Sequence, residues 1–168
     1  MKFSITKSLV AALFAIPFMC SMAMASDIGK VTKRPLPRFV SMKAVEGNVR
    51  RGPSLSHRID WVFKRRDMPL RVTAEHGHWR RVEDRDGMGG WVHYSLLSGA
   101  RTVLVEKDML QLRSRANPAA PVTVALEFGV VARVGACETE WCLLRSGGFK
   151  GWAPKARLWG VAPAEVFN

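Results

Sequence analysis

The chain contains an internal repeat, and this repeat limits its fold more than any other feature. Residues 59–82 align with residues 121–144 without a gap, and after one deletion the match resumes at the Gly-Trp pairs 90–91 and 151–152. No reactive side chain recurs; the shared residues are mainly tryptophan, glycine and β-branched residues. Because a repeat indicates the architecture before any single residue is considered, we expect two copies of one small module.

Residues 1–25 have the features of a cleaved signal peptide. A positively charged start precedes an apolar run, and residues 23–25 follow the small-x-small pattern of a cleavage site. We therefore expect export, with cleavage after Ala25 and no membrane span in the mature chain. Two alternatives remain: an uncleaved membrane helix, which needs roughly 20 apolar residues, and a lipoprotein anchor at Cys20, which lacks the usual small residues before it.

The charge of the chain favours an anionic partner. The formal net charge is +12, and it falls to +10 when Lys2 and Lys7 leave with the signal peptide. In a cytosolic protein this charge would indicate nucleic acid. In an exported protein, the polyanions at hand are cell-wall carboxylates, lipid phosphates and acidic proteins, so no nucleic acid partner is expected. The net charge predicts only that a partner is negatively charged, not which molecule it is. The alternative explanation for the high charge is that it keeps the protein soluble.

The cysteines predict one disulfide. Cys20 is lost with the signal peptide, which leaves Cys137 and Cys142 separated by four residues. An even count in an exported chain is typical of a disulfide, and a hairpin tip of this length brings two Cα atoms within bonding range. The alternative is a redox-active pair, but such pairs usually have C-x-x-C spacing at a helix start.

Two short segments flank the repeats. Residues 26–38 are basic and proline-rich, which predicts an extended, solvated spacer without packing, or alternatively a docking motif. Residues 161–168 form a tail after the second copy.

The periodicity within each copy is that of short β-strands. Apolar and polar residues alternate over residues 70–74, and a glycine-containing turn then leads to Trp79. Residues 130–134 lead in the same way to Trp141. No stretch is amphipathic over more than one or two helical turns. An all-β fold is therefore predicted for both copies.

The order of these motifs resembles the bacterial SH3-like domain family. Residues 48–54 read Asn-Val-Arg-Arg-Gly-Pro-Ser, which fits the family line N-V-R-x-G-P-S, and a W-x-x-V strand at 79–82 and Gly-Trp-Val at 90–92 follow in the family's order. The resemblance covers residues 39–99 and, more divergently, residues 102–160. It implies two tandem SH3-like small barrels, each five-stranded and partly open, in a bacterial periplasm or cell envelope.

The resemblance also implies where a ligand would bind. Trp79 and Trp141 match the tryptophan that helps to line the ligand groove of SH3 relatives, and Pro154 matches the proline of that groove, with His93 in its place in the first copy. The loop that is acidic in polyproline-binding relatives is basic here, at residues 64–67. We therefore expect a neutral or anionic ligand instead of a basic proline-rich peptide.

Two aromatic residues are specific to the first copy. Trp61 and Tyr94 have no aromatic counterpart in the second copy, which makes them further candidates for a ligand patch. The alternative role of the tryptophans is to fill the core of a small domain, and we expect this of Trp91 and Trp152. The first copy is expected to be the binder and the second a disulfide-braced companion. The predicted ligand-binding residues are Trp61, Trp79, Tyr94, Trp141 and Pro154.

The sequence offers little for catalysis or metal binding. Glu75, His76 and His78 lie close together but lack the further ligands that a metal site needs. A Cys-His hydrolase needs a free thiol beside a base, and both remaining cysteines are predicted to be bonded. We expect a non-enzymatic binding module, without cofactor or metal, that recognises peptidoglycan stem peptides or another anionic envelope ligand. The alternative is a periplasmic scaffold that binds a partner protein.

Overall fold

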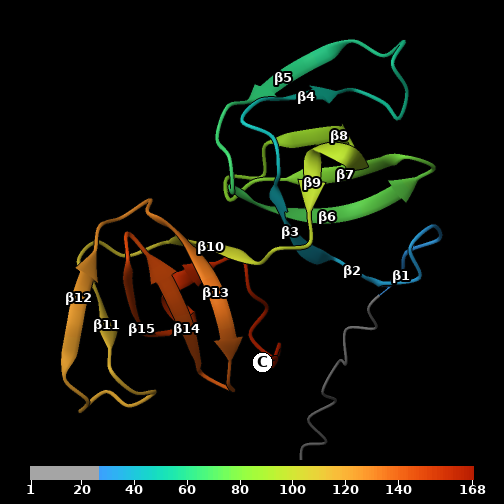
Figure 1. Cartoon of the computed structure of the whole chain (residues 1–168). Helices are drawn as coiled ribbons and strands as arrows, with labels where there is room; N and C mark the ends of the chain where they lie inside the picture. The colour runs from blue at the N-terminus through green and yellow to red at the C-terminus, as the bar shows by residue number, and fades with distance from the viewer. Residues whose placement is uncertain (1–26) are drawn as a thin grey trace, which may run out of the picture.

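The computed structural model describes residues 27–168, which form two β-domains (Figure 1). The predicted signal peptide lies outside the described residues. A short hairpin of β1 (Asp27–Ile28) and β2 (Pro35–Leu36) precedes the first domain. The first domain contains β3 (Arg38–Met42), β4 (Gly47–Arg50), β5 (Ile59–Phe63), β6 (Pro69–His76), β7 (Trp79–Glu83), β8 (Gly89–His93), the 3-10 turn η1 (Tyr94–Leu96) and β9 (Leu97–Ser98).

The second domain repeats this series of elements. Its members are β10 (Thr102–Val105), β11 (Leu110–Arg113), β12 (Val122–Leu126), β13 (Val131–Cys137), β14 (Trp141–Ser146), β15 (Phe149–Pro154), the 3-10 turn η2 (Lys155–Arg157) and β16 (Leu158–Trp159). No helix within residues 27–168 has the length and apolarity needed to cross a membrane.

The two domains have the same sheet topology. The strand order is β5-β4-β8-β7-β6-β3-β9 in the first and β12-β11-β15-β14-β13-β10-β16 in the second. Each strand of one order corresponds to the strand at the same place in the other. The predicted all-β tandem is therefore confirmed. Each sheet has seven strands where five were expected, and it stays open, because its two end strands are not hydrogen-bonded to each other.

The core of each domain is built from aliphatic side chains. Val92 of β8 and Ala153 of β15 are fully buried, whereas the preceding Trp91 and Trp152 are only half-buried. The expectation that these two tryptophans fill the cores is wrong, because neighbouring residues of a strand point to opposite faces. The core residues with no exposed surface are Met42, Val49, Leu70, Val72, Val82 and Val92 in the first domain and Val103, Val105, Leu112, Cys142, Leu144 and Ala153 in the second.

The glycine of each Gly-Trp pair lies where two strands cross closely. A Cβ atom on Gly90 would lie 2.7 Å from the carbonyl oxygen of Arg50, and one on Gly151 would lie 3.0 Å from that of Arg113. At these points β4 meets β8 and β11 meets β15. A residue without a side chain permits this approach, which explains why glycine recurs.

The segment before the first domain is packed. β1 and β2 pair, and Leu36 is buried with the core of the first domain. The turn between the two strands is held by Glu75 of β6, whose carboxylate accepts hydrogen bonds from Thr32 and from the backbone N–H of Val31. The expectation of an unpacked spacer is therefore wrong for residues 27–38, because the Glu75 carboxylate, far away in the chain, accepts hydrogen bonds from this segment.

The side chain of Glu75 is buried, with none of its surface exposed. Burial alone would raise the pKa of its carboxyl. The hydrogen bonds from Thr32, Arg38 and Val31 outweigh that effect and lower the pKa to about 2. Arg38 Nη2 lies 2.7 Å from the carboxylate, so the buried charge is paired.

The two domains are in contact with each other. The hydroxyl oxygens of Ser41 and Thr102 lie 2.6 Å apart, and each is also within hydrogen-bonding distance of a carbonyl oxygen, Ala100 for Ser41 and Asp67 for Thr102. Both side chains are buried. These contacts join the start of the first domain to the start of the second.

The basic loop at residues 64–67 also belongs to this contact. Arg65 donates a hydrogen bond to the carbonyl oxygen of Gly129 at 2.8 Å, and Asp67 lies 3.5 Å from Arg133. Two of the four side chains of this loop are therefore engaged with the second domain.

Candidate binding grooves

Each domain has a groove between the loop that follows β4 or β11 and the tryptophan that begins β7 or β14. The groove of the first domain, the first groove, has a volume of about 370 Å³. The groove of the second domain, the second groove, has a volume of about 430 Å³. Matching residues line them: Asn48, Arg50, Trp79, His93 and Leu96 in the first and Gln111, Arg113, Trp141, Pro154 and Arg157 in the second.

The tryptophan wall of each groove is set by strand pairing. Trp79 lies opposite His93, and Trp141 lies opposite Pro154, so the end of one strand meets the start of its neighbour in both domains. The structure thus brings together three of the predicted ligand-binding residues, Trp79 in the first groove and Trp141 with Pro154 in the second. A groove is present in both domains, although a binding role had been expected mainly for the first.

An arginine at the end of β4 or β11 positions the opposite wall. Arg50 Nη1 donates hydrogen bonds to the carbonyl oxygens of Leu55 and His57, at 2.9 and 2.7 Å. Arg113 Nη1 donates to the carbonyl oxygen of Ala120 at 2.8 Å. Each guanidinium therefore holds its loop in a folded conformation. This role of the two arginines was not predicted from the sequence. The recurrence of an arginine after an apolar residue, at Val49-Arg50 and Leu112-Arg113, is the pattern that indicates it.

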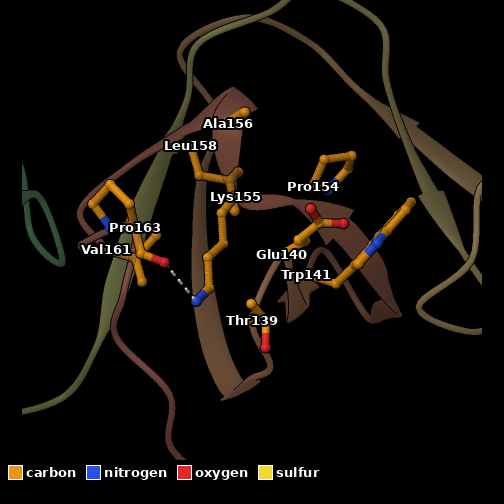
Figure 2. Close-up of a pocket in the computed structure, with 9 residues that line it drawn as sticks. All are labelled: Thr139, Glu140, Trp141, Pro154, Lys155, Ala156, Leu158, Val161 and Pro163. Carbon is orange, nitrogen blue, oxygen red and sulfur yellow. Dashed lines mark hydrogen bonds between the residues drawn. The ribbon is translucent and has the colours of Figure 1, made fainter. Parts of the chain in front are cut away.

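A third groove, the tail groove, lies on the other side of Trp141 and Pro154 (Figure 2). Its volume is about 560 Å³. The buried Lys155 reaches across it and donates hydrogen bonds to the carbonyl oxygens of Pro163 and Glu165, which holds the C-terminal tail in place as a wall. Trp141 and Pro154 thus form a ridge between two grooves.

The predicted disulfide between Cys137 and Cys142 is present. The two cysteines face each other across β13 and β14, next to Trp141. On its other side, Cys137 exchanges two backbone hydrogen bonds with Phe167 of the tail. The bond therefore braces the hairpin that carries both the ridge tryptophan and the attachment of the tail.

The grooves differ in charge. Three cationic residues, Lys107, Arg113 and Arg157, line the second groove, and no carboxylate is among its lining residues. The first groove combines Arg50 with Glu46. The second groove is thus the cationic one, and its charge comes from residues other than those in the basic loop.

The aromatic residues specific to the first domain lie apart from each other. Tyr94 is 50% exposed and its ring lies 4.9 Å from that of His93, between centroids, so it extends the wall of the first groove. His78 completes this cluster, 5.5 Å from Tyr94. Trp61 is 45% exposed on β5 and lines none of the three grooves. The structure therefore unites Tyr94, but not Trp61, with the predicted site.

The acidic and histidine side chains of the first domain form no metal cluster. Glu75 is occupied by the N-terminal hairpin, and within residues 27–168 no group of three or more histidine, cysteine or acidic residues is arranged to hold a metal ion.

Comparison with known proteins agrees with the observed fold. The bacterial SH3 domain model matches residues 43–99 and 106–160, one stretch in each domain. No curated protein matches the chain significantly. Two solved structures from Trichomonas vaginalis are similar, NlpC2 at 9% identity and NlpC1 at 8%, each with a TM-score of 0.34. The alignments cover 73% and 82% of this chain but 48% and 50% of those proteins, so the chain spans about half their length.

The family match covers more than half of the chain. Each of its two stretches covers one of the two sheets that share one strand order, apart from the first strand, β3 or β10. The chain therefore belongs to the bacterial SH3 domain family, of which it carries two tandem copies.

Proposed function

We propose that the protein is an exported, non-enzymatic binding module that recognises an anionic cell-envelope component, with peptidoglycan stem peptides as the leading ligand. Both matched stretches are domains of a binding type. The observation that carries the proposal is that one groove recurs at equivalent positions of both domains and is cationic in the second.

The second groove has the chemistry for such a ligand. Trp141 offers a flat apolar surface of the kind that dominates binding energy at many interfaces, and Pro154 lies directly beside it. Lys107 and Arg157 are exposed and line the same groove. Cations of this kind pair with carboxylates of a ligand and attract it from a distance.

Export is part of the proposal. The small-x-small pattern at residues 23–25 supports cleavage after Ala25. Intact mass measurement of the protein recovered from an envelope fraction tests it, with Ser26 as the expected first residue. A chain that keeps its first 25 residues in that fraction would contradict cleavage.

Co-sedimentation of the mature chain with purified insoluble peptidoglycan tests the ligand. We expect the protein to pellet at low salt and to be released as salt rises, since screening weakens charge pairing. Trp141→Ala should weaken binding by about tenfold or more. Trp61→Ala is the matched control, because this exposed tryptophan lines no groove, and it should bind like the unmodified protein.

Two outcomes would contradict the proposal. Retention of the unmodified chain in the supernatant at low salt would exclude wall binding, and equal effects of Trp141→Ala and Trp61→Ala would exclude the groove. Replacement of Lys107 and Arg157 by alanine should remove most of the salt dependence, which separates charge pairing from stacking.

The second candidate function is a periplasmic scaffold that binds a partner protein. The observation that favours it is the tail groove, whose apolar lining residues Leu158, Val161 and Pro163 lie beside the Trp141 ridge. Failure of the sedimentation experiment, together with capture of an envelope protein that is lost in Trp141→Ala, would support the scaffold in place of wall binding.

A further inference from the structure

A separate cavity of about 690 Å³ lies between the two domains. The N-terminal hairpin, the start of β3, the connection between the domains and the C-terminal tail supply its walls. It shares no lining residue with the three grooves. A volume in the range of about 300–1,000 Å³ is typical of sites for small ligands.

The cavity has an excess of positive charge. Arg34, Arg38 and Arg101 line it, but Arg38 is paired with Glu75 and Arg101 with Glu165, so the excess charge is that of Arg34. Arg101 pairs with Glu165 and also donates to the carbonyl oxygen of Gly160 at 2.8 Å. Arg34 is exposed and sits at the edge of the cavity. An anionic ligand complements this lining.

Two of the three guanidinium groups have donors left over. Nε and Nη1 of Arg38 and Nε of Arg101 are buried and lack a hydrogen-bond partner. A buried donor without a partner costs about 1–3 kcal/mol, and most such groups in proteins are paired. Because these nitrogens are closed to solvent, a ligand oxygen reaches them only if the two side chains shift, whereas Arg34 is open to the cavity.

The remaining walls are apolar and fixed. Phe39, Pro35 and Pro37 line the cavity, and the ring of Phe39 packs edge-on against Trp159, 5.2 Å between centroids. The ligand should therefore carry an apolar group next to its anionic end.

We propose that this cavity binds the terminal carboxylate of a short apolar peptide. The carboxylate pairs with Arg34 at the edge of the cavity, and the last side chain packs on Phe39 and the prolines. A carboxylate fits the planar fork of an arginine, and Arg38 and Arg101 already hold carboxylates, those of Glu75 and Glu165. The site is independent of the grooves and of the function proposed for them.

A nuclear magnetic resonance titration of the ¹⁵N-labelled mature chain tests the site. The probe is N-acetyl-Leu-Ala with a free carboxylate, and its C-terminal amide is the control. We expect the amide signals of Gly99, Ala162 and Ala164 to shift, while the indole N–H signals of Trp79 and Trp141 stay in place. Loss of a charge-assisted hydrogen bond should weaken binding of the amide form by about tenfold or more.

Substitutions separate the cavity from general charge. Arg34→Ala should weaken the peptide by about tenfold, and Lys30→Ala, which removes the same charge from the same hairpin outside the cavity, should have no effect. Ala164→Trp fills the cavity and should abolish binding. Thermal melting of each variant confirms that it is folded.

Four results would overturn the proposal: no shift at the cavity amides, equal binding of the acid and the amide, equal effects of Arg34→Ala and Lys30→Ala, or tighter binding of hexyl phosphate than of the peptide. Shifts confined to Trp79 and Trp141 would assign the peptide to the grooves. Sedimentation with peptidoglycan reports separately on the grooves, so either idea can fail without the other.

Discussion

At the scale of single residues, Glu75 has the clearest energetic role. Its pKa is lowered from 4.5 to about 2, so its stabilising effect is complete above pH 4.5 and is lost as the pH falls toward 2. We expect Glu75→Gln to lower the free energy of unfolding at pH 7 by roughly 2 kcal/mol, and the two proteins to converge near pH 2. Urea denaturation between pH 7 and pH 2 measures this difference.

The control is Glu127→Gln, which alters an exposed carboxylate. Surface changes of this kind usually stay within about 0.5 kcal/mol. A constant difference between Glu75→Gln and the unmodified chain at every pH would contradict the titration of Glu75 as its cause.

The sequence alone predicts the position of the groove residues, but it does not predict the role of Glu75. Trp79, Trp141 and Pro154 could be placed beside grooves because they occupy family positions next to recognisable turns. Glu75 could not be assigned its role, because its partners Thr32 and Arg38 belong to a segment far away in the chain. Contacts of this kind leave no periodic pattern in the sequence.

At the scale of elements, the close approach of β11 and β15 predicts that adding one methyl group at Gly151 lowers the stability of the protein. Gly151→Ala would place a Cβ 2.8 Å from that of Leu112 and 3.0 Å from the Arg113 carbonyl oxygen. We expect a loss of about 1–3 kcal/mol, the usual cost of overpacking, in urea denaturation. Gly135→Ala is the control, since its nearest neighbour would be 3.7 Å away. Equal stability of the two variants would contradict the close crossing.

The disulfide predicts a local effect in the second domain. A short loop closed by a disulfide contributes about 2 kcal/mol in the chain-entropy view. Replacement of Cys137 and Cys142 by alanine should lower the free energy of unfolding by about that amount. Hydrogen exchange should show faster opening of β13, β14 and the tail, and no change in the first domain. Uniform acceleration in both domains would contradict a local brace.

Strands were predictable from alternation, whereas the attachment of the flanking segments was not. The proline-rich composition of residues 26–38 is typical of an extended backbone, and that local tendency is compatible with the observed pairing of β1 and β2. The segment packs on the first domain because Leu36 is buried in its core and Glu75 of β6 accepts hydrogen bonds from the turn. Neither contact can be inferred from the composition of the segment.

At the scale of the whole molecule, the hydroxyl pair between the domains sets their coupling. Thr102→Val keeps the shape of the side chain but removes the hydroxyl that lies 2.7 Å from the Asp67 carbonyl oxygen. We expect a loss of about 1–2 kcal/mol and a separation of the two domain transitions in scanning calorimetry. Thr73→Val, the same change on a strand of the first domain, should leave the calorimetric profile unseparated. Identical profiles for both variants would contradict coupling through this pair.

The contact between the domains could not be read from the sequence. Residues 98–103 are too few to distinguish a hinge from an interface, and Ser41 lies far from Thr102 in the chain. The basic loop at residues 64–67 has the composition of a solvated surface, yet Arg65 contributes to the interface.

The coupling of the domains has a consequence for avidity. Two grooves on domains that contact each other present a fixed spacing, whereas a flexible linker would let the spacing vary. A polymer that repeats its epitope can occupy both grooves at once, and the second attachment then occurs at the high effective concentration of a tethered site. A soluble monovalent fragment has no such advantage. Under the proposed function, the protein should therefore bind intact peptidoglycan more tightly than its soluble fragments, even though a single groove would contact the same chemical group in both.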